Sequence, residues 1–206
     1  MALVKYNNNS ISAITTAGTL SASQVLIKSI TASSSATVSF VDGSSDVVLD
    51  NTYPIYLFHF IDIHPATDNT KITFQGSTNT GSSYGVALSS TRFYAYHTEG
   101  DATPTFEYDA SEDLANSTSY QNASAASGND NDHNLSGYLH LFEPSSTTFV
   151  KNFIIETNST HGNDAALHAF TAGFFNTTSA IDAIQFKMDS GNVDAGKIKL
   201  YGIKDS

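Results

Sequence analysis

The sequence has no cysteine, no tryptophan, only 4 prolines and only 9 Lys plus Arg in 206 residues. The absence of cysteine excludes disulfide bonds, thiolate catalysis and cysteine-based zinc sites. With 20 Asp plus Glu, the formal net charge is −11. Because so acidic a chain repels phosphate backbones, we expect it to bind no nucleic acid.

Long apolar segments are also absent. The longest, residues 55–63, is interrupted by His59 and Asp62. It is far shorter than the roughly 20 residues that a membrane helix needs. The first residues, Met1 to Asn9, lack a charged start followed by an apolar core. We therefore expect no signal peptide and no membrane insertion.

The sequence is rich in phenylalanine, tyrosine and small polar residues. Its 13 Phe and 10 Tyr provide ample apolar area, and burial of that area stabilises a fold by roughly 25 cal/mol per Å². Only 14% of the residues are charged, so hydroxyls and amides must form much of the surface. A chain of this length suits a single β-sandwich domain.

Apolar and polar residues alternate with a period of two, which predicts strands with one buried face. No segment carries the apolar i, i+3, i+4 stripe of a helix, so the predicted fold class is all-β. Many strands with turn signals between them favour an antiparallel β-sandwich, and we prefer a jelly-roll version. The predicted strands are residues 24–31, 37–41, 46–49, 55–64, 71–75, 86–97, 105–108, 138–142, 150–157, 167–175, 181–188 and 197–203.

Two segments depart from the strand pattern. Residues 1–22 are small and polar with isolated apolar residues, and they predict an extended N-terminal arm before a single domain over residues 23–206. Residues 109–136 are rich in Asn, Ser, Ala and Asp and predict a long polar loop, with a short helix or edge strand at residues 113–120. Loops of this length are usually functional or exposed.

The C-terminal segment predicts a β-hairpin. Residues 184–188 and 198–200 each alternate apolar and polar side chains. Between them, residues 189–192 and 194–196 contain Asp, Asn and Gly, which tolerate positive φ. We therefore expect these two strands to be joined by a loop of more than two residues.

This C-terminal segment resembles the ending of a family of virion proteins from marine tailed bacteriophages. Other segments are similar to the same family, so the resemblance extends from about Leu3 to Ile203. None is a known catalytic motif. The resemblance implies a virion structural protein and does not distinguish the capsid from the tail. The similar segments are residues 58–69, 139–142, 148–151, 173–178 and 183–204.

Histidine is the commonest candidate for catalysis or metal binding, and the sequence has 7. His59 and His64 are five residues apart on one predicted strand, so we expect them on opposite faces. His59 and His140 lie among apolar residues and are interpreted as hydrogen-bonded core histidines. His161 and His168 lie in or beside a polar loop. No His-x-His or His-Glu-x-x-His spacing occurs, so the sequence predicts no histidine metal site.

Acidic residues give no stronger indication of a catalytic or metal site. Residues 130–134 begin like a calcium loop, but Leu135 and Leu141 stand where an EF-hand needs Gly and Glu. A solvated loop is the better interpretation, and a calcium site of another type is the alternative. The carboxylate pairs lie near turns, and no nucleophile elbow or phosphate loop occurs. We expect no enzymatic activity, catalytic residue, metal or cofactor. The pairs are Glu99 with Asp101, Glu107 with Asp109, and Glu112 with Asp113.

Tyrosine provides the remaining indication of a binding site. If Tyr94, Tyr96 and Tyr108 lay on an outward sheet face, they would stack on sugar rings as in lectin-like sandwiches. We favour the alternative that their rings pack in the core or at a subunit interface while their hydroxyl groups contact water.

Two functional hypotheses follow. The first is a non-enzymatic phage virion structural protein, a capsid decoration or a tail or capsid appendage, that self-associates. Its arm would add to a neighbouring copy, and its poorly guarded strand edges predict a homotrimer. The alternative is a carbohydrate-binding receptor-recognition module, at a tail fibre or spike tip, whose partner is a host glycan.

Overall fold

The computed structural model describes residues 23–101 and 104–205, which form twelve strands and no helix. The all-β prediction is confirmed. No helix long and apolar enough to cross a membrane occurs in this part of the chain. The strands are β1 (Gln24–Thr31), β2 (Val38–Val41), β3 (Ile55–Pro65), β4 (Ile72–Ser77), β5 (Leu88–Thr98), β6 (Thr105–Tyr108), β7 (Gln121–Asn122), β8 (Leu135–Phe142), β9 (Lys151–His161), β10 (Ala165–Phe175), β11 (Ala183–Met188) and β12 (Val193–Ile203).

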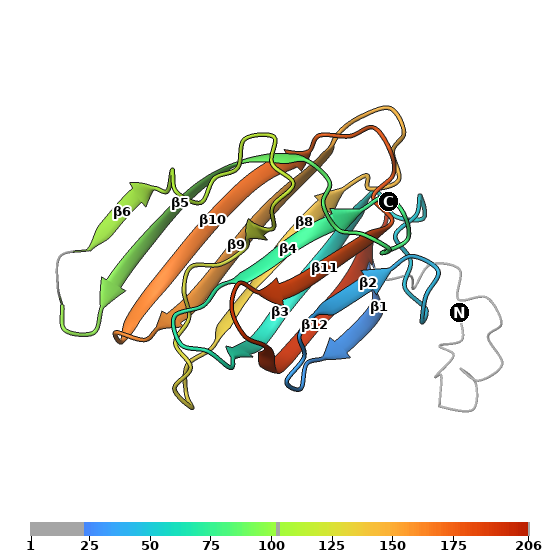
Figure 1. Cartoon of the computed structure of the whole chain (residues 1–206). Coiled ribbons are helices and arrows are strands. Elements are labelled where there is room, and N and C mark those ends of the chain that lie inside the picture. The colour runs from blue at the N-terminus through green and yellow to red at the C-terminus, as the bar shows by residue number, and fades with distance from the viewer. Residues whose placement is uncertain (1–22, 102–103, 206) are drawn as a thin grey trace, which may run out of the picture.

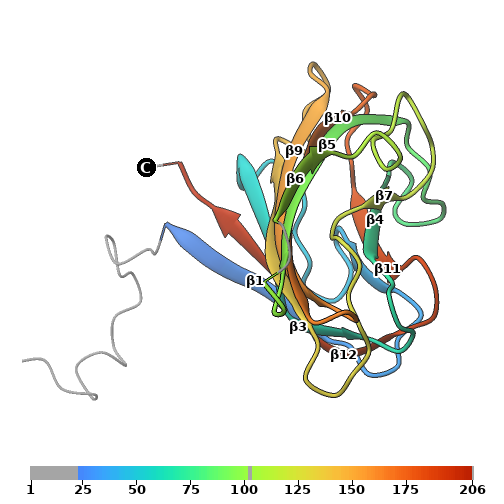
Figure 2. The ribbon, with the colours of Figure 1, turned by 90° about the vertical axis from the view of Figure 1, so that its left-hand side faces the viewer.

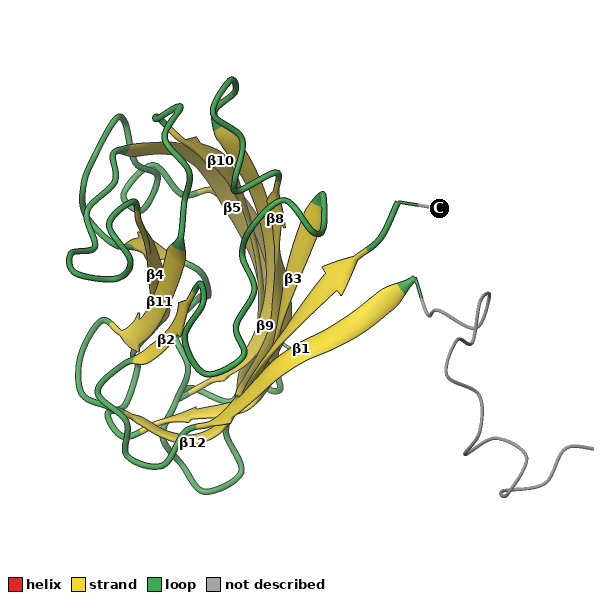
Figure 3. Cartoon of the chain, turned by 90° about the vertical axis from the view of Figure 1, so that its right-hand side faces the viewer, coloured by secondary structure: helices red, strands yellow, loops and turns green. Residues whose placement is uncertain are grey.

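The strands form two antiparallel sheets that pack as a sandwich (Figure 1). The large sheet has eight strands in the order β1-β12-β3-β8-β9-β10-β5-β6. The small sheet has four strands in the order β2-β11-β4-β7. The large sheet is curved, and the small sheet lies on its concave side (Figures 2 and 3). We call this side of the large sheet its inner face and the opposite side its outer face.

The pairing of the strands is that of a jelly roll, as predicted. β1 pairs with β12, β2 with β11, β3 with β8, and β4 with β7. These eight strands therefore form one long folded-over hairpin whose successive strand pairs alternate between the two sheets, the arrangement of a jelly roll. The other four strands, β5, β6, β9 and β10, extend the large sheet beyond β8.

Phenylalanine rings from both sheets form the centre of the core. Phe186 of the small sheet packs against Phe58 and Phe60 of the large sheet, with ring centroids 5.3 and 5.2 Å apart in edge-on contacts. Phe40 and Phe74 surround the same ring at 6.3 and 6.5 Å. Edge-on aromatic pairs stabilise a core beyond the burial of their area. Period-two alternation places these rings on the inner side of each sheet, so the two sheets share one core.

The predicted C-terminal hairpin is wrong. β11 lies in the small sheet between β2 and β4, whereas β12 lies in the large sheet between β1 and β3. Both strands bury one face, but they bury it in the same core from opposite sides. Residues 189–192 cross between the sheets, and Gly196, with φ 112°, lies at a bulge within β12. Alternation identifies a strand with a buried face and does not identify its partner.

Two smaller predictions are also wrong. Residues 46–49 form no strand, because Val47 and Leu49 enter the core from a loop in which the Leu49 N–H donates to Asp42 Oδ1 at 2.8 Å. Residues 113–120 form neither a helix nor a strand, and the strand in this region is β7. The predicted arm, residues 1–22, lies outside the described residues.

Candidate functional site

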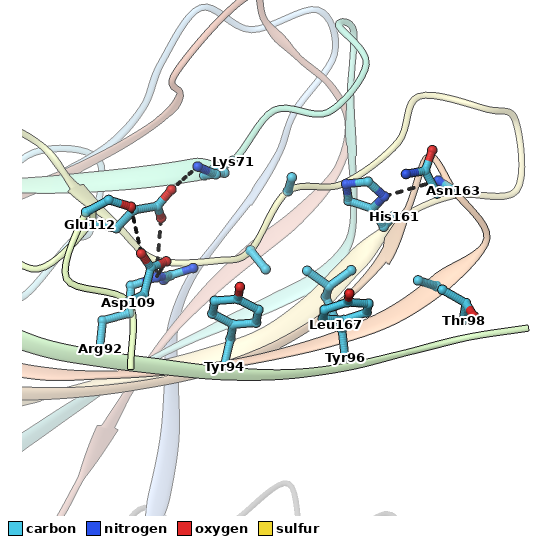
Figure 4. A pocket seen from close by; sticks show the side chains of 14 residues that line it. Lys71, Arg92, Tyr94, Tyr96, Thr98, Asp109, Glu112, His161, Asn163 and Leu167 are labelled. Carbon is cyan, nitrogen blue, oxygen red and sulfur yellow. Dashed lines mark hydrogen bonds and ion pairs between the residues drawn. The ribbon is translucent and has the colours of Figure 1, made fainter. Parts of the chain in front are cut away.

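A cleft of about 510 Å³ lies on the inner face of the extended part of the large sheet (Figure 4). In Figure 1, β5 and β6 lie beyond the area that the small sheet covers. The chain between β6 and β7 crosses the inner face there instead. Because side chains alternate along β5, Arg92, Tyr94 and Tyr96 all point inward. β5, β9 and β10 therefore form the floor of the cleft, and Lys71 and the chain between β6 and β8 form much of the rest.

Tyr94 and Tyr96 stand side by side in this cleft (Figure 4). Their ring centroids are 6.3 Å apart and their planes differ by 23°. The Tyr94 hydroxyl donates to the carboxylate of Glu107, which is its cross-strand partner on β6. This hydrogen bond, with burial, raises the pKa of Tyr94 to about 12. Both rings thus lie on the inner face, contrary to the outward position that the sugar-stacking hypothesis assumed.

Arg92, the only arginine in the sequence, organises one end of the cleft. Its side chain is 1% exposed. The guanidinium donates to Ser124 O at 2.9 Å, to Thr171 Oγ1 at 3.2 Å and to Asn122 O at 3.3 Å. Its Nε also lies 3.3 Å from Asp109 Oδ2 and 3.3 Å from Glu112 Oε2. One buried cation thereby binds three backbone or side-chain oxygens and two carboxylates.

Lys71 completes this charged group. Its Nζ forms an ion pair with Glu112 Oε1. Glu112 Oε2 is buried and makes no well-aligned hydrogen bond, so its stabilisation comes from the ion pair with Arg92. Two cations therefore balance Asp109 and Glu112. Sequence analysis identified the two carboxylates only as surface candidates, and no local motif marks Arg92 or Lys71.

The segment predicted as a long polar loop, residues 109–136, is held against the sheets by buried polar side chains. Gln75 Nε2 donates to Thr118 O at 3.1 Å and to Ser119 O at 2.9 Å. Gln121 Nε2 donates to Glu112 O at 3.0 Å. Many small residues of the segment are buried. Small side chains allow its backbone to lie close to the sheet; the buried ones are Ala123, Ser124, Ala125 and Ser127.

The other end of the cleft is formed by the turn between β9 and β10. His161 and Asn163 lie there, and the Asn163 N–H donates to His161 Nδ1 at 3.1 Å (Figure 4). Leu167 of β10 is the cross-strand neighbour of Tyr96. The cleft therefore has a charged end, a central pair of tyrosines beside an aliphatic side chain, and a second polar end.

Asp109 and Glu112 both approach the same Arg92 nitrogen, so an ion-pair network holds the two carboxylates in place. In the described ranges, no group of three or more acidic or histidine side chains is placed to hold a metal ion. This arrangement is suited to holding a ligand by contact and hydrogen bonding.

The remaining carboxylates form local contacts. Asp101 Oδ1 lies 3.2 Å from His97 Nε2, and the Glu99 N–H donates to Asp164 O at 2.9 Å. Asp113 accepts the Tyr108 hydroxyl. In the segment that resembled the start of a calcium loop, Asp130 O accepts the His133 N–H at 2.8 Å, as in an ordinary turn.

The two predicted core histidines lie on the outer face instead. β3 has a register shift between Phe60 and Ile63, where Asp62 adopts a φ of 50°. This bulge reverses the alternation, so His59 and His64 share the outer face, contrary to the prediction. His140 of β8 also faces outward, beside Tyr138 with ring centroids 5.1 Å apart.

Burial lowers the pKa of both His59 and His140 from the ordinary value of 6.5. Lys199 lowers that of His59 further, and His59 lowers that of His140. Because the unfolded chain binds these protons more readily, the native state loses stability as pH falls through 6.5 toward the lowered values.

We expect the double substitution His59→Gln and His140→Gln to reduce this acid sensitivity. The measurement compares urea midpoints at about pH 7 and about pH 5. The midpoint of the double variant should fall less than that of the unchanged chain. His97→Gln, a change at an exposed histidine away from this pair, is the control. An equal fall in the double variant and the unchanged chain would contradict the assignment.

The fold and the cleft together define a jelly-roll sandwich whose larger sheet is extended to form an open concave site. Comparison with known proteins places it in no established family: no family model, no curated protein and no solved structure matches the chain significantly.

Proposed function

We propose that this chain is a non-enzymatic module of a phage particle that binds carbohydrate through the cleft, as a receptor-recognition part of a tail fibre, a spike tip or another appendage. The observation that carries the proposal is the pairing of Tyr94 and Tyr96 between two polar ends of one concave site. The resemblance to phage virion proteins supports the assignment to a particle.

The chemistry of the cleft suits a sugar. A saccharide presents apolar C–H faces and hydroxyl groups, and a tyrosine offers both an aromatic ring and a polar tip. Leu167 adds apolar surface, while Asn163 and the carboxylates of Asp109 and Glu112 add hydrogen-bonding groups. A volume of about 510 Å³ lies within the usual range for a small-ligand site. Lectin domains are among the proteins built on jelly rolls.

The charge favours a neutral saccharide. Asp109 and Glu112 are already balanced by Arg92 and Lys71, so no free cation among these four groups is left for an acidic sugar. Glu107 adds a further negative charge beside Tyr94. Since the whole chain carries −11, its field repels anionic polysaccharides. We therefore infer an uncharged glycan as the ligand.

We expect Tyr96→Ala to weaken glycan binding by at least about tenfold, because it removes the aromatic surface at the centre of the cleft. The experiment screens the full chain on an array of neutral and acidic bacterial polysaccharides. It then measures the affinity of the unchanged chain and the variant for the glycans retained.

The control for this experiment is Phe149→Ala. Phe149 is 72% exposed in the turn before β9, and it is not among the residues that line the cleft, so the change should not affect the cleft. Asn163→Ala provides a second change at the polar end of the cleft. Failure of the unchanged chain to retain any saccharide, or equal binding by Tyr96→Ala, would overturn the proposal. Preferential retention of acidic glycans would overturn only the inference about charge.

A self-associating structural role, as a capsid decoration or a tail or capsid appendage, is the second candidate. The observation that favours it lies on the outer face of the large sheet, where aromatic side chains are exposed to solvent. The two roles are compatible, since receptor-binding modules commonly act as several copies and gain avidity from the repetition. The partner of that outer face is considered next.

A further inference from the structure

The outer face of the extended strands carries an exposed aromatic patch, although the outer face of a sandwich is usually polar. Phe106 is 72% exposed, Ile154 46% and Phe93 36%. Large exposed apolar patches in soluble proteins usually mark interaction sites. We call this surface the outer patch; it consists of Phe93, Phe106, Tyr108, Ile154, Phe170 and Phe174.

The rings of the outer patch form a continuous ridge across three strands. Phe93 of β5 stacks on Phe170 of β10 with centroids 4.9 Å apart, and Phe106 of β6 contacts Phe93 at 5.5 Å. His168 extends the ridge by stacking on Phe170 at 4.4 Å. Strand register fixes the positions of these rings, because Phe93 of β5 lies directly opposite Phe170 of β10. The ridge is therefore held in place before any partner binds, which reduces the entropy cost of binding.

Two shallow hollows of about 450 Å³ each flank the ridge. The first lies over Ala172 and Gly173, where the side chains are small. The second lies over Ala95 and Ala166, next to Phe106. A surface with both a ridge and hollows can be complementary to itself when a two-fold axis relates two copies.

The strands that carry the outer patch have little charge on their outer face. Among the outward-facing residues of β5, β6, β9 and β10, Glu156 alone carries a formal charge at neutral pH. It accepts the Tyr138 hydroxyl and lies 2.9 Å from His168 Nε2. Elsewhere the chain is strongly acidic, so two copies repel each other in most orientations. The outer patch is the surface through which they can approach.

We propose that the outer patch binds the outer patch of a second copy, forming a two-fold symmetric dimer. Three strands of 11 residues and the shorter β6 present roughly 600 Å². This area reaches the lower end of the roughly 600–1,000 Å² per partner found in specific interfaces. β1 and the end of β12, which project from the sandwich in Figures 2 and 3, lie at the opposite end of the large sheet.

The proposal predicts the mass of the full chain in solution. Light scattering and sedimentation equilibrium at micromolar concentrations should show about 44 kDa, twice the 22.0 kDa of one chain. Phe106→Asp should weaken the dimer by about 30-fold or more, because it places a charge on each side of the two-fold contact. Since Phe106 is so exposed, this variant should still fold, as circular dichroism can verify.

Phe149→Asp is the matched control. Phe149 is also 72% exposed but lies in the turn before β9, outside the outer patch. It should leave the dimer unchanged. A monomer over the whole concentration range would overturn the proposal. A mass near 66 kDa would also overturn it, in favour of the trimer expected from the strand edges. Glycan binding by the cleft is measured separately and does not depend on either result.

Discussion

Replacement of Arg92 by Met should destabilise the fold by about 3–5 kcal/mol, the usual cost of removing one partner from a buried ion pair. The change leaves Asp109 and Glu112 beside each other without their shared cation, and it leaves Ser124 O without its donor. Urea denaturation at one fixed protein concentration measures the loss. The cleft should also lose glycan binding, because Arg92 holds the chain that forms one end of it.

Two further variants separate the causes of this loss. Lys197→Met removes an exposed cation from β12 and should change stability by no more than about 0.5 kcal/mol. The triple variant Arg92→Met, Asp109→Asn and Glu112→Gln removes the unbalanced charges and should recover part of the loss. If Arg92→Met unfolded at the same urea concentration as the unchanged chain, the ion-pair network would have no structural role.

Phe186→Ala should cost about 3–5 kcal/mol, the range observed for removing a buried aromatic ring. Phe186 is fully buried and lies among Phe40, Phe58, Phe60 and Phe74 from both sheets. Its removal therefore opens a cavity at the contact between the sheets. For a domain of this size, we expect the melting temperature to fall by roughly 10 °C.

The control for this change is Phe149→Ala, which removes an equally large but exposed ring. Its effect should stay within about 0.5 kcal/mol. Calorimetry of both variants at equal concentration gives the comparison. Similar melting temperatures for Phe186→Ala and the unchanged chain would mean that this aromatic cluster does not join the two sheets.

Local alternation was sufficient to locate most of the strands. The segments around Phe58, Phe153 and Phe186 alternate apolar and polar residues in whole or in part, and each is a strand in the structure. Alternation predicted a strand wrongly at Val47 and Leu49, because these apolar residues are buried in a loop. It failed again at Asp62, where a bulge shifts the alternation by one residue and moves His64 to the outer face.

The cleft was less accessible to sequence analysis than the strands. Tyr94 and Tyr96 were candidates because they are neighbours on one strand, but the sequence left open which face of the sheet they occupy. Arg92 was not identified at all, since its partners Asp109, Asn122 and Thr171 are 17, 30 and 79 positions away. The single arginine of this acidic chain was the available signal, because a guanidinium can bind several oxygens at once and is a natural centre for an ion-pair network.

The sequence by itself determined that this protein is an all-β sandwich with a phenylalanine-rich core, because period-two alternation and turn residues are local properties. The tertiary structure decided which strands pair, which face each histidine and tyrosine occupies, and where the cleft and the outer patch lie. These features depend on contacts between distant residues, such as Phe93 with Phe170 and Arg92 with Asn122. Such contacts form only when the curved sheet brings those residues together, and no local pattern encodes them.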